Sequence, residues 1–277
     1  MTVKAPFPYY GGKQRLARVI APILPPHNVY IEPFFGGGSM LFAKTPAKYE
    51  LVNDLDHAVV AFFRVLRERP DDLIRALSLT PVARDEFIAA LPDDEQIDDL
   101  EVARRFFVRI TQGIGNHGRS TTGFRGLPLK GAGTNVATST FNALDRFHEI
   151  ANRLRKVVIE NCDALELIAK VTASDALIYV DPPYPKATRN GVSSRGDYRQ
   201  DMPNMSSHYR LLNILRESPA MVILSGYTHP LYESMLKDWH RYEISTTSNM
   251  SRSRKNTAAT AQRTEILWSS VPINYQQ

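Results

Sequence analysis

Residues 176–184 read ALIYVDPPY, five apolar residues followed at once by Asp181, two prolines and Tyr184. An apolar run of this length is typical of a short buried strand, and the consecutive prolines end it. The pattern therefore places a carboxylate, a rigid turn and an aromatic ring at the carboxyl end of a strand. In open α/β sheets, ligands bind at this end of the strands. Taken alone, the same tetrapeptide is also compatible with an ordinary strand-to-loop turn.

Six further runs predict strands, and segments with helical spacing separate several of them. The predicted strands are Val29–Phe34, Tyr49–Asp54, Val157–Asn161, Met221–Ser225, Tyr242–Thr246 and Thr264–Ser269. Apolar residues recur at helical spacing in Lys13–Leu24, His57–Arg67 and His208–Glu217. Strands that alternate with helices predict an α/β protein with a doubly wound, mostly parallel sheet of about seven strands.

The stretch from residue 56 to residue 156 interrupts this alternation. It begins helical and acidic, and from Arg104 to Lys156 it is rich in glycine and basic residues. We interpret residues 56–156 as an inserted domain. Residues 1–55 and 157–277 would together form the second domain, which carries the predicted sheet. The local basic excess favours contact with a phosphate backbone, whereas the excess over the whole chain is only 34 − 29 = 5. A solvated surface with clustered charge is the alternative.

Composition restricts the class of protein further. The single cysteine, Cys162, excludes an intramolecular disulfide framework, so we expect an intracellular, cytoplasmic protein. No apolar run approaches the length of a membrane span, and residues 1–10 lack the pattern of a secretory signal, so no membrane partner is expected. The histidines show no ligand spacing, and we expect no metal.

A glycine-rich turn follows the first predicted strand, where residues 32–39 read EPFFGGGS. Glycines at a strand-to-helix turn let the backbone approach a ligand closely. The next predicted strand ends at Asp54, whose carboxylate can accept hydrogen bonds from two ribose hydroxyls. Leu41 stands where a dinucleotide fingerprint needs a third small residue, which argues against a dinucleotide ligand. This order of parts favours a nucleoside-binding site over a simple tight turn.

Three motifs together resemble those of a known enzyme family. Residues 34–38, FFGGG, are similar to the F-x-G-x-G loop of S-adenosylmethionine-dependent amino-methyltransferases, and residues 181–184, DPPY, resemble their catalytic loop. Residues 9–13, YYGGK, are similar to the aromatic-x-G-G-K segment of Dam-like adenine methylases of the D12 class, and the order of the motifs matches the α group. The resemblance covers nearly the whole chain. It implies a Rossmann-like class I methyltransferase sheet with an inserted, mainly helical target-recognition domain.

The resemblance also implies a role for each matching residue. The catalytic residues would be Asp181, Pro182, Pro183 and Tyr184. The residues that bind S-adenosyl-L-methionine would be Tyr9, Tyr10, Lys13, Glu32, Phe34, Gly36, Gly38, Asp54, Asp163 and Asp181. Tyr9 stands where the Dam enzymes often carry tryptophan, and Asp163 is also a candidate N-cap for a helix over residues 164–171.

The residue types suit methyl transfer to an exocyclic amino group, which is a poor nucleophile because its lone pair is delocalised. The Asp181 carboxylate and the Pro182 carbonyl could accept hydrogen bonds from the two N–H groups of this amino group. The nitrogen would then become more tetrahedral, and its lone pair would be available to attack the methyl group. Tyr184 offers a flat face for a base that must be flipped from the duplex. The predicted activity is site-specific methylation of adenine N6 in DNA, without a metal.

Double-stranded DNA is the expected partner, bound by a monomer, with a dimer as the alternative. The predicted DNA-binding residues are Arg105, Asn116, Arg119, Arg125, Lys186, Arg189, Arg252 and Arg254, and the segment around Gly113–Arg125 is expected to form a hairpin. Three other functions stay open: methylation of cytosine N4 or of adenine in RNA, DNA binding without catalysis, and nucleotide-dependent oxidoreduction. Asp181 favours adenine in DNA, the intact loop argues against loss of catalysis, and Leu41 argues against the oxidoreductase.

Overall fold

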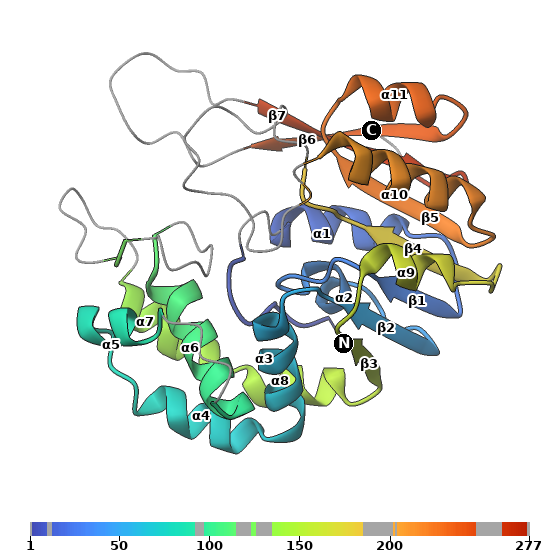
Figure 1. The fold of residues 1–277 in the computed structure, drawn as a ribbon. Coiled ribbons are helices and arrows are strands. Elements are labelled where there is room, and N and C mark those ends of the chain that lie inside the picture. The colour runs from blue at the N-terminus through green and yellow to red at the C-terminus, as the bar shows by residue number, and fades with distance from the viewer. Residues whose placement is uncertain are drawn as a thin grey trace, which may run out of the picture.

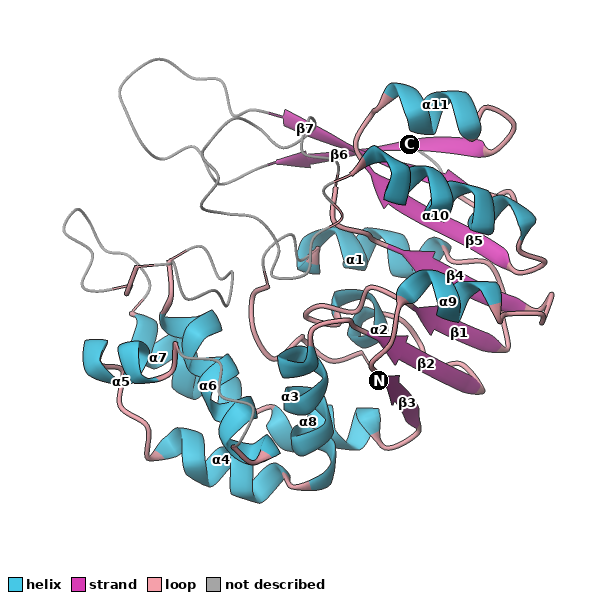
Figure 2. Cartoon of the chain, in the orientation of Figure 1, coloured by secondary structure: helices cyan, strands magenta, loops and turns pink. Residues whose placement is uncertain are grey.

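The computed structural model describes residues 2–9, 13–91, 97–114, 123–125, 135–184, 202, 204–247 and 262–275. Within these ranges helices cover a sheet, and a further group of helices lies beside it (Figures 1 and 2). No helix in the described ranges has both the length and the apolar character needed to cross a lipid bilayer.

Seven strands pair into one sheet across the part of the chain that the structure describes, in the order β3-β2-β1-β4-β5-β7-β6. Their bounds are β1 Val29–Glu32, β2 Tyr49–Asn53, β3 Val157–Glu160, β4 Ala176–Val180, β5 Met221–Gly226, β6 His240–Thr247 and β7 Gln262–Ser269. Strands β1 to β5 pair in parallel, whereas β7 runs antiparallel to both β5 and β6. The predicted α/β sheet is confirmed, and all seven predicted strands are present. β1 ends at Glu32, two residues earlier than predicted, because Pro33 cannot donate to the strand ladder.

The helices connect these strands and cover both faces of the sheet. They are α1 Gln14–Ile20, the 3₁₀ helix η1 Ala21–Ile23, α2 Ser39–Ala43, α3 His57–Glu68, α4 Pro70–Ser78, α5 Arg84–Ala89, α6 Asp99–Gln112, α7 Val136–Leu144, α8 Phe147–Leu154, α9 Ala164–Ala169, α10 Met205–Glu217 and α11 Pro230–Met235. The helix predicted over Lys13–Leu24 is therefore shorter and changes to 3₁₀ geometry at Ala21, one residue before Pro22.

Strand β4 shows how the two faces are filled. Leu177 and Tyr179 belong to the core that includes α1 and α2, whereas Ile178 and Val180 belong to the core that includes α10 and α11. Side chains alternate between the faces of a strand, so a strand covered on both faces is apolar at every position. All five residues of β4 are buried, as the unbroken apolar run predicts.

Helices α3 to α8 occupy the sequence between β2 and β3 and gather beside the sheet (lower left in Figure 1). An aromatic cluster connects them to the rest of the protein. The Phe62 ring of α3 lies 5.1 Å from that of Phe7 and stacks 5.9 Å from that of Phe107 in α6. Phe63 lies 4.8 Å from Phe35, which is in the glycine-rich turn. The helical group and the turn thus share one apolar core, and the division of the chain into two domains stays a prediction.

Candidate active site

The candidate site lies where the carboxyl ends of β1, β2, β4 and β5 meet. β2 and β3 lie on one side of β1, and β4 and β5 lie on the other, so the chain changes direction across the sheet between β1 and β4. A crevice at such a switch point is the usual ligand site of an open parallel sheet. The glycine-rich turn leaves from β1, Asp54 follows β2, and Asp181 follows β4. The topology therefore brings the three predicted parts of the site to one edge.

The turn after β1 depends on glycine at two positions. Gly36 and Gly38 have φ angles of 51° and 70°, a backbone region that side chains disfavour. A Cβ atom on Gly38 would lie 2.6 Å from atoms of the Phe35 and Phe42 rings. A Cβ atom on Gly36 would lie 3.0 Å from the Tyr9 ring, so Tyr9 packs directly on the turn, and its role in binding the cofactor stays a prediction.

Asp54 is held against this turn by backbone hydrogen bonds. The Gly36 N–H donates to Asp54 Oδ2 at 2.7 Å, and the Asp56 N–H donates to Oδ1 at 2.9 Å. Burial raises the pKa of Asp54 to about 7, although the two N–H donors oppose the shift. An acid of this kind, in contact with the glycine turn, is suited to accept hydrogen bonds from ligand hydroxyl groups once it is ionised.

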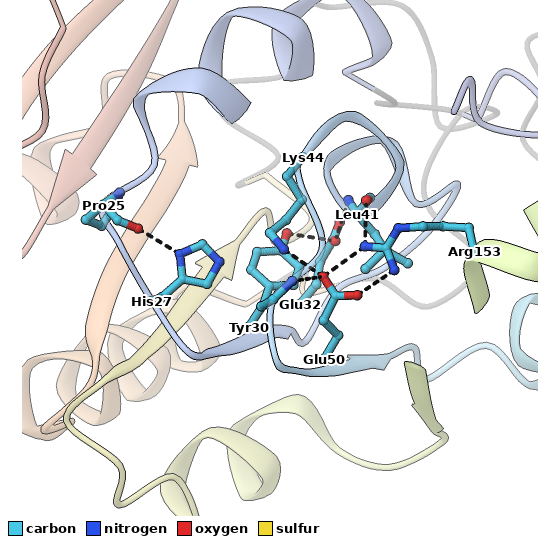
Figure 3. A network of polar contacts seen from close by, with 9 residues as sticks. Pro25, His27, Tyr30, Glu32, Leu41, Lys44, Glu50 and Arg153 are labelled. Carbon is cyan, nitrogen blue, oxygen red and sulfur yellow. Dashed lines mark hydrogen bonds and ion pairs between the residues drawn. The ribbon is translucent and has the colours of Figure 1, made fainter. Parts of the chain in front are cut away.

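Glu32 ends β1 and is buried beneath the same turn (Figure 3). Its Oε2 atom accepts hydrogen bonds from the Tyr30 hydroxyl at 2.9 Å and from the Leu41 N–H at 3.1 Å. Burial raises the pKa of Glu32 to about 8, although both hydrogen bonds oppose the shift. Glu32 therefore fixes the first turn of α2 on the end of β1.

A second buried carboxylate connects this region to the helical group (Figure 3). Lys44 Nζ donates to Glu50 Oε1 at 2.6 Å, and the Arg153 guanidinium of α8 donates to both carboxylate oxygens of Glu50. Arg153 also donates to the Leu41 carbonyl at 3.3 Å. Burial alone would raise the pKa of Glu50, but the hydrogen bonds from Arg153 and Lys44 outweigh it and lower that pKa. Leu41 thus links α8 to the helix that follows the glycine turn.

The end of β4 carries a compact cluster of polar and charged groups. Lys13, which precedes α1, donates from Nζ to Asp181 Oδ1 at 2.7 Å and to Glu265 Oε1 at 2.7 Å. Its third hydrogen bond goes to Ser225 Oγ at 2.6 Å. Burial alone would lower the pKa of Lys13, but the carboxylates of Asp181 and Glu265 outweigh it and raise that pKa. Lys13 is therefore a cation held by two acids.

Asp181 is mostly buried, with a side-chain exposure of 23%, so it stays within reach of a ligand. Burial raises its pKa and the nearby Glu265 adds to the rise, whereas Lys13 opposes it. The single hydrogen of the Tyr184 hydroxyl is shared between Asp181 Oδ1, at an oxygen–oxygen distance of 3.2 Å, and Glu265 Oε1, which is closer. Among the described residues, the hydrogen bonds to the Asp181 carboxylate all fall on Oδ1, and Oδ2 accepts none.

Tyr184 is more enclosed than its predicted role as a stacking platform implies. It is buried, its hydroxyl donates to Glu265 Oε1 at 2.6 Å, and Lys13 Nζ lies 4.9 Å from the ring centroid. The Tyr227 ring packs against it at 4.7 Å in a T-shaped arrangement. Pro182 and Pro183, which precede it, are also buried.

Sequence reasoning missed two members of this cluster. Ser225 ends the apolar part of β5, and its hydroxyl donates to Glu265 Oε1 at 2.9 Å. Glu265 lies in β7 and is buried. A signal for Glu265 was present, because it is the one acid within the predicted strand Thr264–Ser269. A buried acid in an apolar strand needs a partner, which points to a cation or a functional site.

The remaining predicted cofactor residues take different positions. Phe34 is half-buried in the turn after β1. Asp163 caps α9, because its Oδ1 atom accepts hydrogen bonds from the N–H groups of Leu165 and Glu166 at 2.8 and 3.1 Å. The alternative of an N-cap is thus what the structure shows for Asp163, and contact with the cofactor stays a prediction. Tyr10 lies outside the described residues.

Two of the predicted DNA-binding residues are described. Arg105 Nε donates to Glu101 Oε1 at 2.7 Å within α6. Arg125 is half-buried, and its backbone N–H donates to the backbone carbonyl of Gln112 at 2.7 Å. An antiparallel bridge between Gly113 and Phe124 lies beside this hydrogen bond. This bridge joins the two ends of the segment predicted to form a hairpin, and residues 115–122 between them lie outside the described residues. The other six predicted contacts lie outside the described residues: Asn116, Arg119, Lys186, Arg189, Arg252 and Arg254.

The mostly parallel seven-stranded sheet with its reversed strand β7 is the Rossmann-like sheet predicted for a class I methyltransferase. The sequence model of the D12 class N6 adenine-specific DNA methyltransferases matches residues 9–250. Because the match covers most of the chain, the protein belongs to this family.

Two curated relatives carry the same kind of activity in their names. A type II methyltransferase of Lactococcus lactis subsp. cremoris is 22% identical over 92% of this chain and 90% of its own length. A type II methyltransferase of Methanocaldococcus jannaschii is 27% identical over 78% of this chain and 81% of its own. The crystal structure of precorrin 8W decarboxylase from Methanobacterium thermoautotrophicum aligns over 98% of this chain and 97% of its own at 10% identity, with a TM-score of 0.39. A likeness at that score identifies neither fold nor activity.

Proposed function

We propose that this adenine-specific DNA methyltransferase takes its methyl group from S-adenosyl-L-methionine and transfers it to N6 of an adenine flipped out of duplex DNA. The observation that carries the proposal is the placement of Asp181. Its carboxylate is fixed by Lys13 and Tyr184 at the end of β4, next to the strand that ends in the glycine turn. The D12 family match supports adenine in DNA over cytosine N4 or adenine in RNA.

The residues at the ends of β1 and β2 fit the proposed cofactor. Gly36 and Gly38 allow the turn to take its positive φ angles while aromatic rings pack closely against it. Asp54 and Glu32 supply carboxylates, which suit the hydroxyl groups and positive charges of S-adenosylmethionine. We assign Asp54 to the ribose, and Glu32, Phe34, Gly36 and Gly38 to the methionine part. Tyr9, Tyr10 and Lys13 would line the pocket, and Asp163 would lie near the adenine ring of the cofactor.

S-adenosylmethionine, when bound, supplies an electrophilic methyl group whose carbon–sulfur bond breaks with its electron pair left on sulfur. Asp181 Oδ2 and the Pro182 carbonyl are the two acceptors that we assign to the N–H bonds of the target amino group. Hydrogen bonds from the amino group to these two acceptors favour a tetrahedral nitrogen. The lone pair of that nitrogen is then available to form the new bond to the methyl carbon. The nitrogen, which is positively charged after the transfer, then loses one proton to the surrounding water. Both acceptors interact more strongly as positive charge develops on nitrogen, so they stabilise the transition state more than the substrate.

A flipped base must be enclosed on its faces and edges. Tyr184 contacts Asp181 and packs against Tyr227 in a T-shaped arrangement, and we assign Tyr184 to contact with the target base. DNA contacts are assigned to the basic segments around the hairpin base and the regions outside the described residues. We further propose that the protein acts as a monomer in the cytoplasm, where its DNA substrate is accessible.

Incubation with labelled S-adenosylmethionine and duplex DNA, followed by digestion to nucleosides, tests the proposal. We expect N6-methyladenine as the product. Asp181→Ala should lower the rate about 1,000-fold while S-adenosylmethionine binding is retained. Asp175→Ala is the matched control, because Asp175 immediately precedes β4 at its opposite end and contacts Asn28. Methylated cytosine as the product would refute the assigned base, and an Asp181→Ala variant with the wild-type rate would refute the mechanism.

A further inference from the structure

Glu265 occupies an unusual position, because a buried acid comes from the one strand that runs against its neighbours. β7 pairs with β5 so that Gly226 lies opposite Ile266, which places Glu265 beside the carboxyl end of β5. Its Oε1 atom accepts three hydrogen bonds, from Lys13 Nζ at 2.7 Å, Tyr184 OH at 2.6 Å and Ser225 Oγ at 2.9 Å. The side chain is only 5% exposed. Such a set of contacts fixes both neighbours of Asp181.

We propose that Glu265 is a positioning residue for methyl transfer: its carboxylate shares the charge of Lys13, so that Asp181 keeps a net negative charge toward the target nitrogen. This role rests on the function proposed above. Nothing in the family match or in the names of the relatives assigns it.

Charge counting gives the physical reason. Lys13 carries one positive charge, and its ammonium has three N–H donors, all used on Asp181, Glu265 and Ser225. If Lys13 faced Asp181 alone, the two would form a neutral pair and the ammonium would cancel much of the field of the carboxylate. With Glu265 ionised, the three groups sum to one negative charge. That surplus is what an amino group needs nearby as it becomes positive.

The contacts of Tyr184 extend the same argument. Its hydroxyl lies between Glu265 Oε1 at 2.6 Å and Asp181 Oδ1 at 3.2 Å, so the shorter contact is to Glu265. Glu265 therefore draws both Lys13 and Tyr184 away from exclusive contact with Asp181. Both of these contacts fall on Asp181 Oδ1, and Oδ2 stays available for the substrate within the described part of the chain.

The pKa of Asp181 distinguishes this proposal from a purely structural role of Glu265, because a structural role would not require that pKa to depend on the charge of Glu265. Three charged or titratable groups act on the pKa of Asp181, and they are Lys13, Tyr184 and Glu265. Asp181 in turn acts to raise the pKa of Glu32, Tyr179 and Tyr232. Of the three groups that act on Asp181, the Glu265 carboxylate acts to raise its pKa. Replacing it with a neutral amide of similar shape should therefore lower the pKa of Asp181.

The test compares single-turnover methyl transfer by wild-type protein, Glu265→Gln and Glu265→Asp, at saturating S-adenosylmethionine and DNA across a range of pH. We expect Glu265→Gln to lower the rate about 10- to 100-fold and to move the acidic limb of the profile to lower pH. Glu265→Asp keeps the negative charge, so the acidic limb of its pH–rate profile should stay at the wild-type pH. Its methyl-transfer rate should be higher than that of Glu265→Gln. S-adenosylmethionine affinity, measured by calorimetry, should change less than about threefold in both variants.

Glu243→Gln is the matched control, because Glu243 is an exposed acid in the same antiparallel hairpin and pairs with Arg241. It should leave the rate and the profile unchanged. A Glu265→Gln variant with a wild-type rate and an unmoved acidic limb would overturn the proposal, and so would a Gln variant more active than the Asp variant, which would indicate a role in shape alone.

Two further results keep the test decisive. If Glu265→Gln does not fold, the Glu265→Asp variant still tests the proposal, because a charge-conserving variant as slow as Asp181→Ala would contradict it. Wild-type protein that methylates no adenine would refute the proposed function before any variant is compared. Wild-type protein that is active alongside a fully active Glu265→Gln variant would refute only the role of Glu265.

Discussion

Gly36 and Asp54 are joined by a hydrogen bond of 2.7 Å from the backbone N–H of the glycine to the carboxylate. The bond ties the turn after β1 to the end of β2, so that two segments separated by a strand and a helix form one wall of the site. It also explains why a glycine with positive φ and an acid occur together here, because the turn must present its N–H group toward β2.

Asp54 should make cofactor binding depend on pH. Burial raises its pKa to about 7, and an acid is protonated below its pKa. Because the neutral acid is a poorer acceptor for ribose hydroxyls, S-adenosylmethionine affinity should weaken as the pH falls through about 7. Asp54→Asn should lower the affinity about 10- to 100-fold and remove this part of the pH dependence. Calorimetric titrations at several pH values, with Asp175→Asn as control, measure both effects, and an unchanged affinity would exclude Asp54 from the site.

Gly38→Ala should destabilise the protein and its site. The new Cβ atom would lie 2.6 Å from the rings of Phe35 and Phe42, and the φ angle of 70° is unfavourable for alanine. Backbone strain and overpacking together should lower the free energy of unfolding by about 2 kcal/mol or more. Gly123→Ala is the control, because among the described residues its Cβ atom would meet the end of the flexible Ile114 side chain, at 3.3 Å, and no backbone atom or ring. Denaturant unfolding of both variants gives the comparison, and equal losses would contradict the argument.

Glu50→Gln should be strongly destabilising although Glu50 is far from the proposed chemistry in sequence. The change leaves Lys44 and Arg153, both nearly fully buried, without their shared counter-charge. Removal of one partner from a buried ion pair costs about 3–5 kcal/mol. Glu68→Gln, which breaks an exposed pair with Arg67, should cost less than about 1 kcal/mol. Thermal and denaturant unfolding measure the loss of unfolding free energy in the two variants. Equal losses in Glu50→Gln and Glu68→Gln would show that the contacts of Glu50 with Lys44 and Arg153 do not stabilise the fold.

Glu32 should make the stability of the cofactor-free protein fall as the pH rises. Its pKa is about 8 in the folded protein and about 4.5 in the unfolded chain, so the folded state holds the extra proton between these values. The free energy of unfolding therefore decreases with rising pH across that window, by about 2 kcal/mol or more. Glu32→Gln cannot ionise and should flatten the dependence. A variant with the same slope as wild-type protein would show that Glu32 is already ionised at neutral pH.

Much of the fold follows from local sequence patterns. Each of the seven strands was predicted from its apolar residues, and the prolines after β4 mark where that strand ends. The order of the strands could not be derived in this way, because a local apolar run does not say which strands pair, and β7 inserts between β5 and β6. The end of the helix predicted over Lys13–Leu24 was also wrong in detail, since Pro22 favours 3₁₀ geometry over a continued α-helix.

The site, like the fold, has parts that the sequence predicts and parts that appear only in the structure. Asp54 and Asp181 were predicted because they follow strands that run in parallel, and the structure brings both to one edge of the sheet. Glu265 was missed because its partners, Lys13, Tyr184 and Ser225, are distant in sequence and meet only in the folded protein. Asp163 illustrates the opposite case, since a local capping pattern explains its two hydrogen bonds to α9.

The polar cluster at the end of β4 joins residues 252 positions apart, Lys13 near the first helix and Glu265 in the last strand. During translation the glycine turn and the Asp-Pro-Pro-Tyr loop leave the ribosome well before Glu265 does. A chain that terminates early in β7 would then carry every predicted motif and still lack the group that balances Lys13. The charge balance at Asp181 therefore depends on the pairing of β7 with β5 as much as on the segments that carry the motifs.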